Sequence, residues 1–214
     1  AKNILSVKKN AETFEKIDKL IGDNAIDVII GGPPCQGFSL TGPRNFDDAR
    51  NKLYLAMIET VRRYKPRAFM IENVPGMATL YKGEVKNEIL KRFKKMNYSI
   101  TCKILCSADY GVPQIRKRLV FIGLRDHKDE FEFPTPSHTQ DNYITCEQAI
   151  SDLPSLVDNI GSDVSDYIME PLNEYQRTMR GECKILYNHK AVSHKQFVKD
   201  IIALSNGEDE GFNR

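Results

Sequence analysis

IDVIIGGPPCQGFS, residues 26–39, begins as a short apolar run and ends in prolines and glycines around a single cysteine. A continuous β-branched run bounded by Gly-Gly is typical of a strand buried within a parallel sheet. A cysteine that only filled a core would not need two prolines before it and a Gln-Gly pair after it. The stretch therefore predicts a buried strand over 26–32, followed by a loop that presents Cys35 for chemistry.

The chain after this loop alternates between two periods. Apolar residues recur at helical spacing in 50–64 and 83–96, whereas 67–74, 98–105 and 118–124 are strand-like. Strands that alternate with helices in this way are typical of an α/β fold with a doubly wound sheet. We therefore expect a Rossmann-like sheet.

The pattern changes after residue 125. The stretch FEFPTPSHTQDN has the composition of a linker, and residues 155–193 are polar and irregular in pattern. We expect one main domain over 1–125, and a linker with the start of a second lobe over 126–214.

Composition limits the classes of protein to which the chain can belong. Thirty-one Lys and Arg stand against 29 Asp and Glu, a formal net charge of +2, so any nucleic-acid site would be a local basic patch. Five cysteines, an odd number without repeating spacing, argue against a disulfide framework and favour a reducing compartment. No apolar run is long enough to span a membrane, and the N-terminus lacks the apolar core of a signal peptide.

Two further patterns have ordinary explanations. Cys102 and Cys106, with His127 and His138 downstream, do not have the spacing of a zinc site, so we interpret the cysteines as core residues and expect no metal. The basic stretch KRFKKM (91–96) is interpreted as the solvent face of a helix rather than a DNA-binding surface.

Reactive side chains gather at the expected strand ends. In open α/β sheets, ligands bind outside the carboxyl ends of the parallel strands. The candidates come from three separate segments: Cys35, Glu72, Asn73, Gln114, Arg116 and Arg118. We expect a cysteine, a carboxylate and two arginines to converge on one edge of the sheet.

Four motifs, in order and at fitting spacing, resemble those of the cytosine-C5 DNA methyltransferases. They are Pro34-Cys35-Gln36 within GGPPCQGFS, the segment DARNKL (48–53), Glu72-Asn73-Val74, and the Gln-x-Arg-x-Arg pattern of YGVPQIRKR (110–118). The resemblance covers roughly residues 20–160. It implies an incomplete S-adenosylmethionine-dependent methyltransferase fold, with a catalytic domain over 1–125 and a linker and the beginning of a target-recognition region over 126–214.

The resemblance also implies roles for the candidate residues. Cys35 would add as a thiolate to C6 of a flipped-out cytosine, which makes C5 nucleophilic. Glu72 would hydrogen bond or donate a proton to N3, and Arg116 would hold O2. Arg118 would be a supporting or phosphate-binding partner, and Asn73 would fix the cytosine and the Pro-Cys loop.

The implied methyl donor is S-adenosylmethionine. Pro34 and Leu53 match family positions that touch it, and Asp23 is a candidate partner for the adenine. The glycine-rich donor motif would precede residue 1 and a late motif would follow residue 214. We therefore expect a fragment that is inactive alone or needs a partner.

Double-stranded DNA is the expected partner, and we expect a monomer that binds no membrane. The expected DNA contacts are Gln36, Ser39, Thr41, Arg44 and Gln114. The leading hypothesis is methyl transfer to cytosine C5 in DNA, for example as the modification enzyme of a restriction system, in the cytoplasm of a bacterium or in a nucleus. An RNA (tRNA) methyltransferase and a catalytically silent nucleic-acid-binding module of the same fold remain as alternatives.

Overall fold

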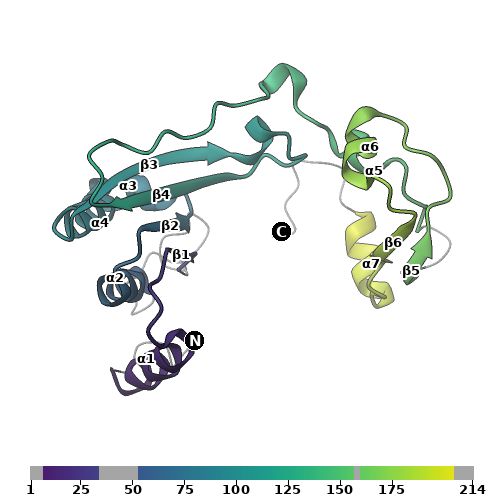
Figure 1. Cartoon of the computed structure of the whole chain (residues 1–214). Helices are drawn as coiled ribbons and strands as arrows, with labels where there is room; N and C mark the ends of the chain where they lie inside the picture. Colours follow the sequence, from purple (N-terminus) through teal and green to yellow (C-terminus); the bar gives the residue numbers. More distant parts are fainter. Residues whose placement is uncertain (1–6, 34–52, 157–159, 205–214) are drawn as a thin grey trace. The chain divides into compact units, whose positions relative to one another are not determined.

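The computed structural model of the chain describes residues 7–33, 53–156 and 160–204 (Figure 1). The chain divides into two compact units, residues 1–143 and residues 144–214. The boundary falls within the region for which a linker is expected, and the functional division at residue 125 stays a prediction.

The first unit alternates helices and strands up to β3. Its helices and strands are α1 (Val7–Ile21), β1 (Val28–Gly31), α2 (Leu53–Tyr64), β2 (Ala68–Asn73), α3 (Gly76–Thr79), α4 (Glu84–Lys94), β3 (Tyr98–Cys106) and β4 (Lys117–Arg125). The described part of this unit also has the 3-10 turns η2 (Leu80–Gly83), η3 (Ser107–Tyr110) and η4 (Gln140–Asn142). The expected α/β fold is confirmed, as an incomplete Rossmann-like arrangement with a mixed sheet.

The four strands form one sheet in the order β1-β2-β4-β3. β1 and β2 are parallel, with Gly31 opposite Ile71. β4 is antiparallel to both of its neighbours, β2 and β3. The reversal follows from chain length, because the loop 107–116 is too short for the crossover that a parallel pair requires and leaves only a hairpin.

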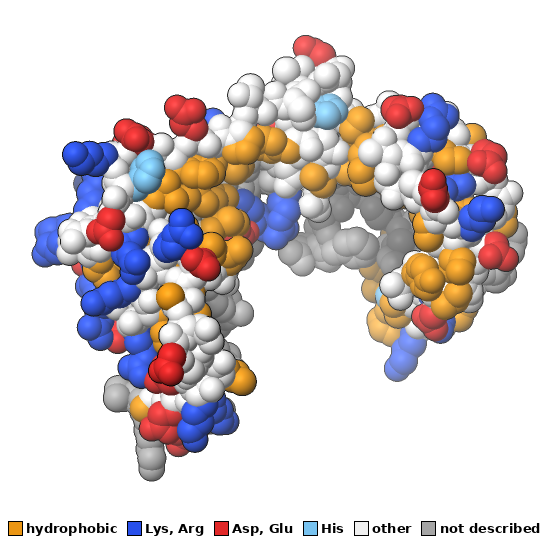
Figure 2. Space-filling view, viewed as in Figure 1, with side chains coloured by type: hydrophobic (Ala, Val, Ile, Leu, Met, Phe, Trp, Pro, Cys, Tyr) orange, Lys and Arg blue, Asp and Glu red, His pale blue; other side chains and the backbone are white. Residues whose placement is uncertain are grey.

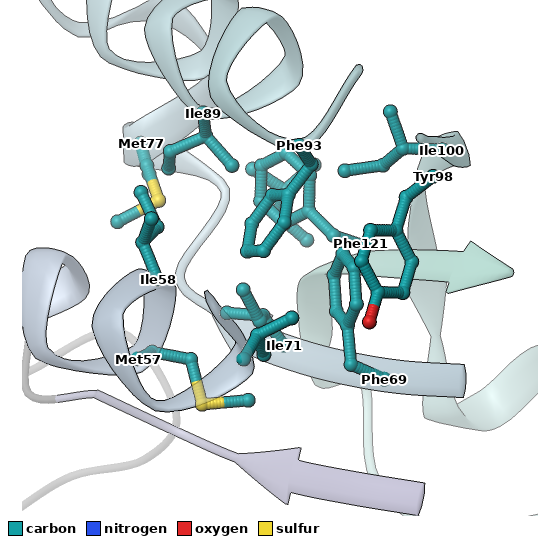
Figure 3. Packing of buried hydrophobic residues seen from close by; sticks show 12 residues of the cluster. Met57, Ile58, Phe69, Ile71, Met77, Ile89, Phe93, Tyr98, Ile100 and Phe121 are labelled. Atoms are coloured by element: carbon teal, nitrogen blue, oxygen red, sulfur yellow. The ribbon is translucent and has the colours of Figure 1, made fainter. Parts of the chain in front are cut away.

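The core lies on one face of this sheet, under α2 and α4 (Figure 3). Phe69 of β2 stacks on Phe93 of α4 with ring centroids 4.1 Å apart, and Tyr98 meets Phe69 edge-on at 5.1 Å. The Tyr98 hydroxyl donates a hydrogen bond of 2.7 Å to the Pro66 carbonyl. Aromatic pairs in these geometries add to the free energy gained by burial alone.

Helix α4 shows why the basic stretch 91–96 has its composition. Ile89 and Phe93 are buried, whereas Lys91, Arg92 and Lys94 are exposed to solvent. Figure 2 shows Lys and Arg side chains gathered over the part of the first unit that contains α2 and α4. The helical solvent face expected for this stretch is confirmed.

Strand β1 differs from the expectation of a strand buried on both faces. Ile29 packs against the core, but Val28 and Ile30, which point to the opposite face, are 55% and 71% exposed. Side chains alternate between the faces of a sheet, so a run of apolar residues is buried throughout only when both faces are covered. In the described residues, the second face of β1 is open.

The second unit also differs from expectation, because the described residues 160–193 contain two strands and a helix. It contains α5 (Cys146–Ile150), β5 (Gly161–Asp166), α6 (Glu174–Arg180), β6 (Ile185–Lys190) and α7 (Gln196–Ala203), with β5 and β6 antiparallel. Arg180 forms a buried ion pair of 2.8 Å with Asp152 and lies over the Tyr167 ring. The polar sequence of β5, GSDVSD, conceals the strand because it carries almost no apolar alternation.

We predict that Gly123→Ala destabilises the first unit. Gly123 lies in β4 directly over Phe69, and a Cβ there would collide with the phenyl ring. Overpacking of this kind costs about 1–3 kcal/mol of the free energy of unfolding, to be measured by urea denaturation. Lys103→Ala, an exposed change on the neighbouring strand, is the control and should stay within about 0.5 kcal/mol. A more stable Gly123→Ala protein would contradict this packing.

Candidate active site

The carboxyl ends of β1, β2 and β3 and the amino end of β4 lie at the same edge of the sheet. This follows from the register, in which Asn73 at the end of β2 is opposite Leu119, and Cys106 at the end of β3 is opposite Lys117. The reversed strand therefore carries Arg118 to the edge where β2 ends with Glu72 and Asn73. The structure brings these two candidates together from separate segments.

Glu72 and Arg118 form an ion pair at this edge. Arg118 Nε lies 2.7 Å from Glu72 Oε1, and the two side chains are 38% (Glu72) and 25% (Arg118) exposed. They meet because both project from the face of the sheet opposite the core, on neighbouring antiparallel strands. A half-exposed pair of this kind contributes little to stability, so its main effect is to orient the carboxylate.

The carboxylate also faces the end of β1. A Cβ on Gly32 would lie 3.2 Å from Glu72 Oε2, so the absence of a side chain at Gly32 leaves room for this oxygen. Gly32 lies three positions before Cys35 in the sequence. Glu72 thus has one oxygen on Arg118 and the other beside the backbone that leads to the cysteine.

Asn73 ties the end of β2 to the same backbone. Its side chain is only 2% exposed; Nδ2 donates a hydrogen bond of 3.1 Å to the Pro33 carbonyl, and Oδ1 accepts one of 2.9 Å from the Val74 amide. Pro33 lies two positions before Cys35. Both polar groups of the buried amide therefore have partners, and the chain entering the cysteine segment is fixed to β2.

Gln114 and Arg116 lie on the exposed loop 107–116, between β3 and β4. The backbone of Arg116 is held at its carbonyl, which accepts hydrogen bonds from the Ser107 amide at 2.9 Å and the Ser107 hydroxyl at 3.2 Å. Within the described part of the chain, the side chain that pairs with Glu72 is that of Arg118, not Arg116.

The other predicted residues are placed as follows. Asp23 is exposed in the turn between α1 and β1, before the amino end of β1, so the structure does not bring it to this edge. Leu53 begins α2, and its side chain is not among those described. Six predicted residues lie outside the described residues: Pro34, Cys35, Gln36, Ser39, Thr41 and Arg44.

The cysteines of β3 lie in or against the core, as expected. Cys106 is buried and Cys102 half-buried against the core, and burial raises the pKa of the Cys102 thiol. Among the described residues, no group of three or more His, Cys, Asp and Glu side chains could hold a metal ion. No helix in the described ranges is long and apolar enough to cross a membrane.

The sequence analysis missed two residues that anchor the loop 107–116. The Tyr143 hydroxyl donates a hydrogen bond of 2.5 Å to Asp109 Oδ1, across a separation of 34 positions. Neither residue belongs to a recognised pattern of chemistry, and no local signal in the sequence pairs them.

Comparisons with known proteins were made for the whole chain. The family described as C-5 cytosine-specific DNA methylase matches residues 1–208. The Type II methyltransferase M.DdeI of Desulfomicrobium norvegicum is 38% identical over 207 residues, which cover 94% of this chain and 50% of that protein. The Type II methyltransferase M1.HphI of Haemophilus parahaemolyticus is 37% identical over 193 residues, which cover 88% and 45%.

A solved structure also resembles the chain. It is a putative DNA modification methyltransferase encoded within an Escherichia coli prophage, with a TM-score of 0.60 and 30% sequence identity, covering 85% of this chain and 50% of that one. The chain spans about half the length of these relatives.

We predict that Asn73→Ala costs about 1–3 kcal/mol of the free energy of unfolding, because it leaves the Pro33 carbonyl and the Val74 amide without their partner. Urea denaturation measures the change. Asn87→Ala, an exposed asparagine on α4, is the matched control and should be close to neutral. Equal, small effects of the two substitutions would show that Asn73 does not hold the two segments together.

Proposed function

The chain belongs to the C-5 cytosine-specific DNA methylase family, and on this premise we propose that it carries the catalytic part of an enzyme that methylates cytosine C5 in double-stranded DNA. One observation carries the proposal. At a single edge, Glu72 is oriented by Arg118 and faces Gly32, while Asn73 holds Pro33, and both backbone positions lead directly to Cys35.

The proposed chemistry begins at Cys35. Its thiolate adds to C6 of the cytosine, and the electron pair moves into the ring toward N3, so that C5 becomes nucleophilic. Glu72 meets the ring at N3 through Oε2, the oxygen on the Gly32 side, while Arg118 keeps Oε1. Once C5 carries a methyl group from the donor, removal of the C5 proton by a base restores the C5–C6 double bond and releases Cys35 as a thiolate. An ordered water is the candidate for this base.

The proposed site for the base is completed by Arg116 and Asn73, and the proposed site for the DNA by residues of the loops. Arg116 holds the base O2, and Asn73 keeps the entry to the cysteine loop in place. Reaction at C6 requires that the cytosine leave the stacked duplex. Gln36, Ser39, Thr41, Arg44 and Gln114 are the proposed contacts to the DNA from which the base is extruded.

S-adenosylmethionine supplies an electrophilic methyl group when bound. The edge of the sheet fits a bound molecule, because Gly32 is exposed and places bare backbone at the end of β1. Pro34 and Leu53 are the proposed contacts to the donor, and Asp23, in the turn before β1, is not proposed as one.

The names of the relatives favour a role in a restriction-modification system. M.DdeI and M1.HphI are bacterial Type II methyltransferases. We propose the same role for the protein that contains this chain, acting on DNA as a monomer in the bacterial cytoplasm.

We predict that DNA containing 5-fluorocytosine forms a covalent adduct with the full-length protein at Cys35, because fluorine at C5 blocks the elimination that releases the cysteine. Random-sequence duplexes, S-adenosylmethionine and denaturing gels make the adduct visible. Cys35→Ser should form no adduct and transfer methyl groups at background rate, while still binding DNA.

Cys183→Ser, which changes an exposed cysteine of the second unit, is the matched control and should keep the adduct. An adduct with fluorinated RNA but not DNA would replace the proposal by an RNA methyltransferase. No adduct with either would favour a silent nucleic-acid-binding module.

A further inference from the structure

The loop 107–116 carries Gln114 and Arg116, and its own backbone hydrogen bonds join its residues to one another. The Gln114 amide donates to the Val112 carbonyl at 2.7 Å, and the Arg116 amide donates to the Gln114 carbonyl at 2.9 Å. Ser107 binds the Arg116 carbonyl, and the Val112 amide donates to the Ser107 carbonyl at 3.2 Å. The tip is open to solvent: Val112 and Ile115 are 44% and 74% exposed. Because these hydrogen bonds join the loop only to itself, they leave it able to tilt as a unit about the end of the β3–β4 hairpin.

A second set of contacts ties the first turn of this loop to the segment 134–143. The backbone carbonyl of Asp109 accepts hydrogen bonds from the Ser137 amide at 2.9 Å and the His138 amide at 3.0 Å. The Asp109 carboxylate accepts the Tyr143 hydroxyl at 2.5 Å. Asp109 is therefore bound at both ends, through its main chain and its side chain, to a segment about thirty positions later in the sequence.

Neighbouring contacts support the same tie. The Tyr110 hydroxyl donates to the Pro134 carbonyl at 3.1 Å. Gly111 adopts a φ of +81° and lies against the His138 ring, where a Cβ would approach Cε1 to 3.0 Å. The segment has a defined shape of its own, because Thr139 and Asn142 cap the turn η4 that precedes Tyr143.

We propose that Asp109 is a positioning residue: by joining the segment 134–143 to the loop 107–116, it holds Gln114 and Arg116 at the edge where Glu72 and Arg118 lie. The inference rests on the proposed function of this edge. Asp109 acts through the loop backbone and Tyr143.

The contact between Asp109 and the segment 134–143 matters because Arg116 and Arg118 are held in place by different parts of the structure. Arg118 is in β4 and is held by the ladder and by Glu72. Arg116 precedes the strand, so its placement depends on the loop. A displacement of about 1 Å in a positioning group can cost about 100-fold in rate, so a contact that prevents the loop from tilting bears on the rate.

The Asp109–Tyr143 hydrogen bond is present at neutral pH. It raises the pKa of Tyr143 to about 12 from an ordinary value of 10.0, with further contributions from burial and from Cys106. Because the folded pKa is the higher one, the neutral hydroxyl is favoured below pH 10, and its contribution is lost only as pH rises through about 12. The tyrosine therefore gives a spectroscopic signature of the tie.

The test compares three variants of the full-length protein. Tyr143→Phe and Asp109→Ala remove the bond, and both should lower the single-turnover rate of methyl transfer by about 10-fold to 100-fold, with DNA affinity little changed. Asp109→Asn keeps an acceptor oxygen and should restore most of the rate. Amide hydrogen exchange in 107–116 should rise in the first two variants and stay near the wild-type value in the third.

Tyr98→Phe is the matched control, since it also removes a tyrosine hydroxyl that donates a hydrogen bond, here to the Pro66 carbonyl and away from the loop 107–116. It should lower stability while leaving the transfer rate unchanged. If Tyr143→Phe lowers stability and leaves the transfer rate unchanged, as expected for Tyr98→Phe, Asp109 is structural and the proposal is overturned. An unchanged rate despite faster exchange overturns it as well.

Failure of the proposed function gives a different pattern. A wild-type protein that forms no adduct and transfers no methyl group would overturn the function of the edge. Two measurements that need no activity would then test the contact between Asp109 and Tyr143: amide hydrogen exchange in 107–116 and the ionisation of Tyr143. The ionisation near pH 12 should be absent in Tyr143→Phe and should move toward pH 10 in Asp109→Ala. Wild-type-like exchange and ionisation in Asp109→Ala would overturn the tie.

Discussion

In the sheet of the first unit, β4 runs against β2 and β3, and the site depends on this reversal. A parallel β4 would begin at the opposite edge and would place Arg118 a strand length away from Glu72. The reversed strand instead starts where β2 ends, so the ion pair forms between neighbours on one face. The short loop 107–116 imposes the reversal because it allows only a hairpin. The geometry of the edge is thus a consequence of loop length as much as of the residues that lie there.

The register of β2 then places alternate side chains on opposite faces of the sheet. Phe69 and Ile71 point into the core, and Met70 and Glu72 point away from it. A slip of one residue would exchange the two sets, bury the carboxylate and expose the aromatic ring. Packing of Phe69 against Phe93 and beneath Gly123 opposes such a slip. The core therefore fixes the position of the site, although none of its side chains belongs to the site.

The residues at this edge of the sheet are positioned partly by strands and partly by loops. Glu72, Asn73 and Arg118 are placed by the sheet, whereas Arg116 and the cysteine segment follow strand ends. Functional residues on loops need a scaffold that restricts them. Asn73 restrains the entry to the cysteine segment through Pro33, and Asp109 restrains the arginine loop through Tyr143. Both restraints are hydrogen bonds between segments that are distant in sequence.

The amino-acid sequence by itself determined the α/β class, the helices α2 and α4, and the candidate residues at strand ends, because periodicity and motif chemistry are local properties. It also determined the family resemblance, which the match over residues 1–208 confirms. It did not reveal the open face of β1, because burial depends on what covers a strand. It did not reveal β5 either, because that strand has almost no apolar alternation. Only the tertiary structure decided the direction of β4, the pairing of Glu72 with Arg118 rather than Arg116, and the contact of Asp109 with Tyr143. These three features are contacts between segments that are distant in the sequence. Such contacts do not produce a periodic pattern in either segment, so the sequence alone does not predict them.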